Sequence, residues 1–201
     1  MFDKLTEQSW VVIPDFIHSE MVSLLRQDLK QRQADGEFKR AGISKGSSHN
    51  VNLDIRSDSI LWLNEDTKVD VQKQLFAMIE DLRQSLNRGL FLGLKEFEGH
   101  YAAYAAGELY QKHKDAFHKG NSRVVSFVLY LNETWQAEWG GQLRIFDAND
   151  ETHVAAEVDP QGGRLVLFLS SEIEHEVLPS SAERLSFTGW FLQPSIDSQK
   201  L

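Results

Sequence analysis

The sequence contains no cysteine, no excess of basic charge and no long apolar run, and each absence excludes a class of protein. Without cysteine the 201-residue chain forms no disulfide, and any metal site has to use histidine, carboxylate or similar oxygen ligands. The formal net charge of -9 argues against a general polyanion binder, because nucleic-acid affinity rests mainly on basic charge facing phosphates. The longest apolar runs fall far below the roughly 18 residues that a membrane span needs.

The amino-terminal segment shows no targeting signal. MFDKLTEQSWVVIPDF has no basic region followed by a long apolar run, so we do not expect a signal peptide. We therefore expect a cytoplasmic protein that binds neither nucleic acid nor membrane. The length fits one domain, and an apolar content of 41% suffices for a real core.

The first half of the chain carries two helix patterns. A short strand ending at Pro14 comes first, and Ser19 would then cap a helix with apolar residues along one side. The stretch from residue 69 to residue 90 repeats apolar residues at the 3.6-residue period of a helix. Between these helices, residues 40–52 are rich in glycine and serine and predict a mobile loop, which is either a surface linker or a lid over a site.

After Gly99 the pattern changes from helix to strand. VVSFVLYLN, RLVLFLSS and RLSFTGWFLQ are rich in β-branched and aromatic residues and are separated by turn signals such as DPQGG. RLVLFLS is apolar on both faces, which predicts a strand buried on both sides. The chain is thus predicted to be α+β, with a sandwich or small barrel holding most of the core. We expect effectively one domain, in which residues 1–98 support a core formed by residues 99–195.

One polar stretch, YQKHKDAFHKG, lies just before the apolar run VVSFVLYLN. In a strand, side chains two residues apart point the same way, so His113 and Asp115 would present an imidazole and a carboxylate on one face. That pair is half of a metal site. Two such residues without further ligands are more often a chance feature of a surface strand. The interpretation therefore needs a third ligand from elsewhere in the chain.

His175 is the best candidate for that ligand. It follows the buried strand RLVLFLS, and in a sandwich it can fold back over the strand of His113. His118 and His153 lie in polar turns, and His49 lies in the glycine-rich segment. Two histidines and one carboxylate form the facial triad of non-haem Fe(II) oxygenases, which leaves three adjacent positions open for a bidentate 2-oxoacid and then dioxygen.

Such a site needs a cation for the far carboxylate of the 2-oxoacid. Arg184 lies shortly after His175 and beside the apolar run LSFTGW. Its planar fork matches a carboxylate with two parallel hydrogen bonds. The alternative for Arg184 is a surface ion pair with Glu183.

The ordered set HKD, H and RLS resembles the 2-oxoglutarate and Fe(II)-dependent oxygenases, and among them the prolyl 4-hydroxylase branch. The resemblance covers residues 101–190 well and extends into LDIRSDSILWL, residues 53–63. YLNETWQAEWGGQLRIF and IEHEVLPSSAERLSFTGWF are similar to the hypoxia-factor prolyl hydroxylases and to their bacterial counterparts that act on elongation factor Tu.

The resemblance implies a double-stranded β-helix (jelly roll) with the N-terminal helices packed on one sheet. It also implies Fe(II) on His113, Asp115 and His175, 2-oxoglutarate as co-substrate, dioxygen as oxidant and ascorbate as reductant. It further implies that Arg184 and Tyr130 bind the distal carboxylate of 2-oxoglutarate, and that Tyr104 (or, failing it, Tyr101) binds its metal-bound end. It implies that Thr188 and Trp190 line the pocket behind the metal. It also implies that Tyr110, Arg123 and Trp190 contact the substrate, and that Arg56 with Asp58 shapes the end of the loop 40–52 that closes over the substrate.

The implied activity is 4-hydroxylation of a prolyl residue in an exposed loop of another protein, with elongation factor Tu as the candidate partner. Three other functions stay open. The first is hydroxylation of free proline or another small molecule, which needs a closed pocket rather than an open groove. The second is a 2-oxoglutarate- or oxygen-responsive binding protein that catalyses little. The third is a metal-free β-sandwich adaptor, if the triad is a coincidence.

Overall fold

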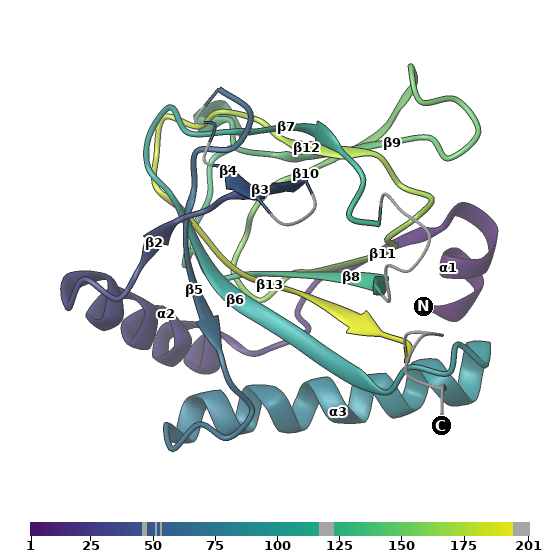
Figure 1. The fold of residues 1–201 in the computed structure, drawn as a ribbon, viewed down its shortest axis with the longest axis horizontal. Helices are drawn as coiled ribbons and strands as arrows, with labels where there is room; N and C mark the ends of the chain where they lie inside the picture. Colours follow the sequence, from purple (N-terminus) through teal and green to yellow (C-terminus); the bar gives the residue numbers. More distant parts are fainter. Residues whose placement is uncertain (46–47, 51, 53, 117–122, 195–201) are drawn as a thin grey trace.

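Two antiparallel β-sheets form the body of the protein (Figure 1). The computed structural model describes residues 1–45, 48–50, 52, 54–116 and 123–194. Within these residues the larger sheet has seven strands in the order β1-β11-β8-β13-β6-β5-β2, and the smaller has four in the order β10-β9-β12-β7. The strands of the larger sheet are β1 (Trp10–Ile13), β2 (Lys39–Arg40), β5 (Ser59–Leu63), β6 (Glu96–Tyr104), β8 (Arg123–Tyr130), β11 (Leu165–Leu169) and β13 (Arg184–Leu192). Those of the smaller sheet are β7 (Tyr110–His113), β9 (Leu143–Phe146), β10 (Val154–Val158) and β12 (His175–Val177).

Strand β11 shows why both faces of the larger sheet are apolar. Leu165 and Leu167 are buried among the residues that face the helices, whereas Val166 and Phe168 are buried among those that face the smaller sheet. Side chains alternate between the two faces of a strand, so a run that is apolar at every position can fill both layers. The predicted burial of this strand on both sides is confirmed.

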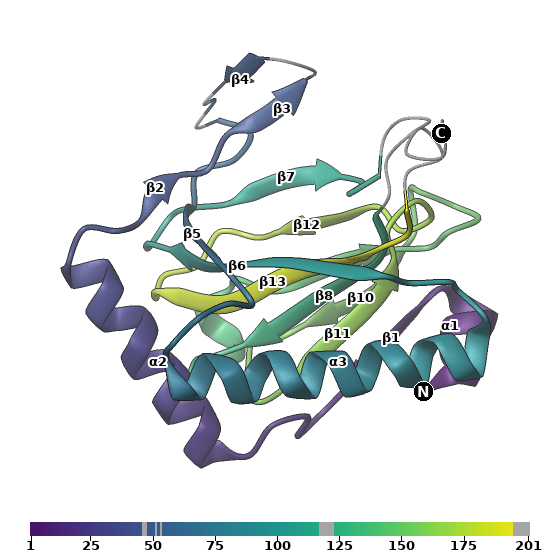
Figure 2. The same cartoon turned by 60° about the horizontal axis from the view of Figure 1, so that its bottom comes forward.

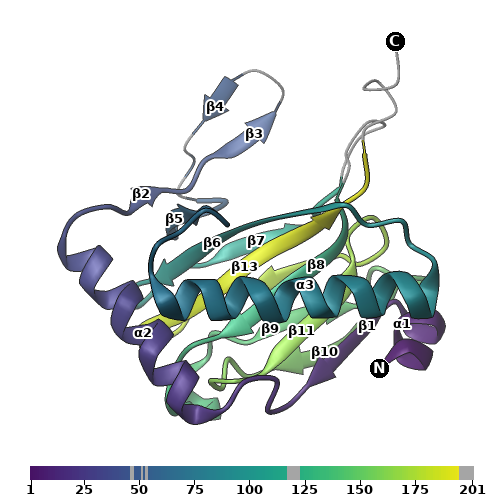
Figure 3. The ribbon, with the colours of Figure 1, turned by 90° about the horizontal axis from the view of Figure 1, so that it is seen from below.

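Helices cover the outer face of the larger sheet (Figures 2 and 3). They are α1 (Phe2–Gln8), α2 (Ser19–Ala34) and α3 (Asp70–Leu90). The buried leucines of α2 and α3 join one apolar cluster with the larger sheet. Each such side chain contributes about 1.5–3 kcal/mol when it leaves water. The two predicted helices are present, but Ser19 is the first residue of α2 and makes no capping bond, and α1 was not predicted.

The segment predicted to be a loop, residues 40–52, contains two short strands. Strands β3 (Ile43–Lys45) and β4 (Ser48–Asn50) pair antiparallel, with Lys45 opposite Ser48, and they stand away from both sheets (Figures 2 and 3). The loop prediction is wrong for these residues, because a hairpin held by backbone hydrogen bonds needs no apolar alternation in its sequence. Residues 46, 47 and 51 lie outside the described part of the chain.

Candidate active site

Strands β7 and β12 bring the three predicted metal ligands together. His113 and His175 are paired across the two strands, and their ring centroids lie 4.2 Å apart. Asp115 Oδ1 is 3.6 Å from His113 Nε2, and Asp115 Oδ2 is 3.8 Å from His175 Nε2. One ligand atom from each residue lies within 4.8 Å of the others. Strand β7 ends at His113, so Asp115 comes from the bend that follows and not from the same strand as predicted.

Hydrogen bonds on the far side of each ring decide which nitrogen is left for a metal. His113 Nδ1 lies 2.7 Å from the carbonyl oxygen of Gln111, and His175 Nδ1 lies 3.4 Å from that of Ile173. A carbonyl only accepts, so Nδ1 carries the hydrogen and Nε2 keeps its lone pair. Both Nε2 atoms then face a carboxylate, and such an arrangement of acceptors is stabilised by a cation between them.

The carboxylate and the second imidazole of the triad are in the charge states that a divalent cation needs. Burial raises the pKa of Asp115. The opposing effects of His175, His113 and the hydroxyl of Ser126 are larger together, so the pKa lies below its usual range. The Ser126 hydroxyl donates to Asp115 Oδ2 over 2.6 Å. Burial, with His113 beside it, lowers the pKa of His175 to about 4, against the opposing charge of Asp115. At neutral pH Asp115 is therefore ionised and His175 is neutral.

Of the other histidines that were considered, only the side chain of His153 is described, and it does not join this cluster. His153 is exposed in the turn before β10. His118 lies outside the described residues, and the side chain of His49 is not described either.

A pocket opens beside the triad, between the two sheets. It includes nine residues that the sequence predicted for the site: Arg56, Tyr104, Tyr110, His113, Asp115, His175, Arg184, Thr188 and Trp190. It also includes five that were not predicted: His100, Ala102, Val128, Leu143 and Val177. Alternation along β6 and β8 could have found three of these five, because His100 and Ala102 lie four and two residues from Tyr104, and Val128 lies two residues from Tyr130.

Arg184 lies at one end of the pocket and is almost fully buried, with 2% of its surface exposed. Its Nε donates to the carbonyl of Gly141 over 3.0 Å. Within the described residues, one terminal nitrogen of Arg184 and the hydroxyl of Tyr130 have no hydrogen-bond partner. The guanidinium lies 5.0 Å from the centre of the Tyr130 ring. The alternative ion pair with Glu183 is not formed, because Glu183 pairs with Lys30.

The two candidate tyrosines of β6 lie on opposite sides of the larger sheet. Tyr104 lines the pocket, with its ring 5.1 Å from the Arg184 guanidinium. Tyr101 is buried in the helix-side core, and its hydroxyl donates to Asp28 over 2.8 Å. An odd separation of three residues puts two side chains of a strand on opposite faces, so Tyr101 is not in reach of the pocket.

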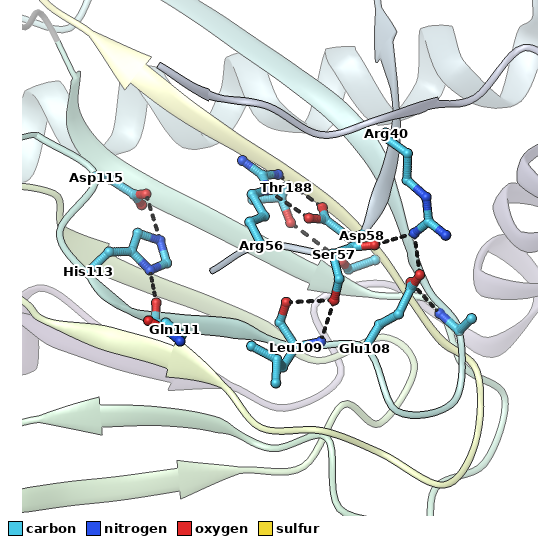
Figure 4. A network of polar contacts seen from close by, with 12 residues as sticks. Arg40, Arg56, Ser57, Asp58, Glu108, Leu109, Gln111, His113, Asp115 and Thr188 are labelled. Atoms are coloured by element: carbon cyan, nitrogen blue, oxygen red, sulfur yellow. Dashed lines mark hydrogen bonds and ion pairs between the residues drawn. The ribbon is translucent and has the colours of Figure 1, made fainter. Parts of the chain in front are cut away.

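Figure 4 shows His113 between Gln111 and Asp115, and near them the pair of Arg56 and Asp58. Arg56 donates to both carboxylate oxygens of Asp58, over 2.7 and 2.9 Å. The Arg56 guanidinium lies 4.7 Å from the ring centre of Tyr110, and that ring stacks on His113 at 3.6 Å. Burial lowers the pKa of Arg56, but Asp58 raises it well above its usual value, so Arg56 stays charged. The pair of Arg56 and Asp58 thereby holds Tyr110 against a metal ligand.

Arg123 and Trp190 meet at the opposite end of the pocket. The Arg123 guanidinium lies 3.5 Å from the ring centre of Trp190, and its Nε donates to Glu98 over 2.7 Å. Trp190 lines the pocket, whereas Arg123 is not among the residues that line it. Ser126, which orients Asp115, was not predicted, because its place in an apolar strand gave no signal.

Comparisons with known proteins agree with this geometry. The model of the 2OG-Fe(II) oxygenase superfamily matches residues 99–192. A prolyl-4-hydroxylase from Pseudomonas putida, known from its crystal structure, is 39% identical and superposes with a TM-score of 0.84, covering 96% of this chain and 97% of that one. The chain belongs to the prolyl hydroxylase family of the 2OG-Fe(II) oxygenase superfamily. The predicted double-stranded β-helix, which is the fold of these oxygenases, is confirmed.

Two further relatives are less similar in sequence than the Pseudomonas putida enzyme. A Trichoplax adhaerens prolyl hydroxylase, solved with a hypoxia-inducible factor peptide, is 26% identical with a TM-score of 0.87, covering 96% of this chain and 87% of that one. Human Egl nine homolog 1 is 29% identical over 188 residues, which are 90% of this chain and 43% of that protein. The chain spans about half or less of the length of the first curated relatives that it matches. No helix in the described residues has the length and apolar character of a membrane span.

Proposed function

We propose that the protein is a 2-oxoglutarate- and Fe(II)-dependent dioxygenase that hydroxylates a prolyl residue of another protein at the 4-position. The observation that carries this proposal is the pairing of two features in one pocket. One is a cluster of two imidazoles and a carboxylate within 4.8 Å. The other is the buried guanidinium of Arg184, which lines that pocket beside the buried phenol of Tyr130; one terminal nitrogen of Arg184 and the hydroxyl of Tyr130 have no partner among the described residues.

The ligand set suits Fe(II). His113 and His175 offer neutral nitrogen, Asp115 offers charged oxygen, and there is no cysteine to favour a soft metal. Iron bound there supplies the activation of dioxygen, coupled to decarboxylation of 2-oxoglutarate, that hydroxylates an unactivated carbon. The protein's own part is to hold the ligands in place: Gln111 and Ile173 fix the imidazoles, and Ser126 fixes the carboxylate.

The partnerless atoms at the end of the pocket suit the distal carboxylate of 2-oxoglutarate. Leaving a buried donor unsatisfied costs about 1–3 kcal/mol, and more for a charged group. A carboxylate that accepts from Arg184 and Tyr130 removes that cost. Burial and the charge of Asp58 raise the pKa of Tyr104, so its hydroxyl stays protonated and donates toward the metal-bound end of the co-substrate. Thr188 and Trp190 form the wall behind the metal.

The substrate side of the pocket suits a peptide. Tyr110 and Arg56 form one edge, and Trp190 under Arg123 forms the other. The β3–β4 hairpin stands over the side of β7 and is the segment that we propose closes over the substrate. Proline is a favourable target in an exposed loop, because its backbone φ is already fixed. Elongation factor Tu is the candidate substrate because of the sequence resemblance, and ascorbate is the proposed reductant.

Hydroxylation is tested directly by mass spectrometry. The protein is incubated with Fe(II), 2-oxoglutarate, ascorbate and either purified elongation factor Tu or a cell lysate, and prolines are searched for one added oxygen. The Asp115→Ala variant serves as the inactive control, and the exposed His153→Ala variant serves as the active one. The proposal is wrong if no prolyl residue gains oxygen and no succinate forms above the level of the Asp115→Ala control.

A further inference from the structure

His100 is a buried histidine in the pocket wall that none of the predicted roles uses. It lies on β6, two residues before Ala102, and faces the same side as Tyr104. Across the sheet it is paired with Trp62 of β5 and with Thr188 of β13. Only 1% of its surface is exposed. These neighbours put the imidazole in the same pocket as the metal triad.

Neither ring nitrogen of His100 has a hydrogen-bond partner among the described residues. The nearby Nε1 of Trp190 also has none there. Buried polar groups in folded proteins are nearly always hydrogen-bonded, because leaving one without a partner forfeits its hydration. A group bound in the pocket can supply the partner that the described residues do not supply.

Packing alone does not explain an imidazole at this position. The ring packs against two indoles, with its centroid 4.8 Å from that of Trp62 and 5.5 Å from that of Trp190, and the two indole centroids are 6.2 Å from each other. A leucine or methionine would fill the same space without burying two polar atoms. The indoles cover part of the ring, and its nitrogens have no hydrogen-bond partner among the residues that the structure describes.

The chemistry of the missing partner follows from what the pocket offers. Burial lowers the pKa of His100 well below its usual value, Arg56 and Arg123 lower it further, and Asp115 opposes them. The imidazole is therefore neutral, with one nitrogen that donates and one that accepts. Trp190 Nε1 and the partnerless nitrogen of Arg184 can only donate a hydrogen bond. The hydroxyl of Tyr130 also donates when it faces an anion. A ligand that satisfies these groups is rich in acceptor oxygen.

We propose that His100 is a positioning residue that donates a hydrogen bond to an oxygen atom of the small ligands bound beside the metal. This inference rests on the proposed function. Two ligands share the required chemistry: a carboxylate oxygen of 2-oxoglutarate, and a water or dioxygen molecule at an open metal position. The neutral ring aims the ligand without adding charge to the site, and Trp62 and Trp190 keep the ring from turning away.

The test compares His100→Leu, which removes the hydrogen bond, with His100→Gln, which keeps a donor and an acceptor. The affinity of the Mn(II)-loaded protein for 2-oxoglutarate is measured by calorimetry without turnover. The KM for dioxygen, kcat and the ratio of succinate to hydroxylated product are measured with Fe(II). Loss of one hydrogen bond to a charged or metal-bound group corresponds to about a tenfold effect.

The two sources of oxygen give different results. If the partner is the carboxylate, His100→Leu weakens 2-oxoglutarate binding about tenfold and His100→Gln restores most of it. If the partner is water or dioxygen, 2-oxoglutarate binding is unchanged, whereas the KM for dioxygen or the succinate ratio rises about tenfold and is again restored by glutamine. The exposed His153→Leu and His153→Gln variants are matched controls that change neither quantity.

A spectroscopic measurement covers the case in which a variant fails to fold. In wild-type protein labelled with ¹⁵N-histidine and loaded with diamagnetic Zn(II), the ring N–H of His100 becomes protected from solvent exchange. A carboxylate partner gives this signal only after 2-oxoglutarate is added, and a metal-bound water gives it with Zn(II) alone. The inference is overturned if the signal stays absent in both states and the KM for dioxygen of His100→Leu equals that of wild type, or if His100→Leu matches wild type in every ligand measurement. Wild-type protein that does not bind 2-oxoglutarate at all would instead refute the proposed function.

Discussion

At the scale of single residues, the triad is a set of side chains whose protonation states depend on one another. Asp115 stays ionised because two imidazoles and the Ser126 hydroxyl offset its burial. His175 stays neutral because its burial and its neighbour His113 outweigh the nearby carboxylate. A cation bound between them replaces the weak contacts of 3.6 and 3.8 Å by direct ligation. Removing Asp115 therefore changes the charge of the site as well as its number of ligands.

Asp115→Ala should abolish metal-dependent turnover while leaving the fold intact. The variant loses the one charged ligand, so we expect Mn(II) affinity and substrate-linked turnover to fall by at least about a hundredfold. This loss is larger than the usual effect of replacing a residue that only hydrogen-bonds to a metal ligand. Calorimetry with Mn(II), succinate release and circular dichroism measure the three properties. A variant that keeps wild-type Mn(II) affinity would show that Asp115 is not a ligand.

Arg184→Ala should chiefly raise the requirement for 2-oxoglutarate. Charge-assisted hydrogen bonds contribute about 1.5–3 kcal/mol, so the KM for 2-oxoglutarate is expected to rise at least about tenfold. Arg184→Lys should recover only part of this loss, because an ammonium lacks the planar fork. Arg144→Ala, which removes an arginine that pairs with Glu157 and Glu176 on the smaller sheet, is the control. Unchanged affinity in Arg184→Ala would mean that another cation binds the co-substrate.

Residue patterns predicted the triad but not every residue around it. His113, Asp115 and Arg184 stand in short polar stretches beside apolar strands, where polar side chains are conspicuous. His100 stands in GHYAAY and gives no such signal. Its importance arises from the register of β5, β6 and β13, which puts Trp62 and Thr188 on either side of it. That register depends on contacts between segments far apart in the chain, and a single sequence does not encode it in any short pattern.

At the scale of elements, apolar periodicity predicted the long helices and the central strands, and it failed where an element is short or polar. α3 repeats buried leucines at helical spacing, and β11 is apolar at every position. The sequences of the two strands in the β3–β4 hairpin show no apolar alternation, so the sequence did not predict them. Strand β7 ends at His113 although its sequence pattern continues, because the chain bends at Asp115 to turn the carboxylate toward the histidines.

The helices can be tested as a support that is separate from the chemistry. Leu25 of α2 is fully buried, whereas the adjacent Leu24 is 45% exposed. We expect Leu25→Ala to lower the free energy of unfolding by about 2–5 kcal/mol, because it leaves a cavity. Leu24→Ala should lower it by no more than about 0.5 kcal/mol. Urea denaturation measures both, and equal effects would contradict the packing of α2 on the sheet. At temperatures where both variants are folded, their affinity for 2-oxoglutarate should equal that of wild type.

At the scale of the whole molecule, the larger sheet separates a region that stabilises the fold from a region that binds ligands. Its outer face packs on the helices through a large apolar cluster. Its inner face forms a smaller cluster with the second sheet, which includes Tyr104, Tyr130 and Phe168 beside the buried polar residues of the pocket. The same strand, β13, carries Phe187 toward the helices and Arg184 toward the pocket. Burying Arg184, His100 and the triad costs free energy, and the helix-side core offsets it.

The buried neutral histidines give the metal-free protein a definite dependence of stability on pH. An unfolded histidine has a pKa near 6.5, and His100 has a pKa well below that in the folded protein. Below pH 6.5 the unfolded chain therefore binds a proton that the folded protein does not. The stability contributed by keeping His100 neutral is complete above pH 6.5 and is lost as the pH falls toward the folded-state pKa. Each such group contributes a slope of at most about 1.4 kcal/mol per pH unit in this window.

His100→Leu should remove one of these slopes. Urea denaturation of chelator-treated protein between pH 6.5 and pH 5 is expected to show a free energy of unfolding that falls less steeply for the variant than for wild type, by up to about 1.4 kcal/mol per pH unit. His175 keeps a similar slope in both proteins, because its pKa of about 4 also lies below the unfolded value. His153→Leu, at an exposed site, should retain the wild-type slope. Parallel profiles for wild type and His100→Leu would show that His100 takes up its proton equally readily in the folded chain, which is incompatible with a ring that is 1% exposed and packed against Trp62 and Trp190.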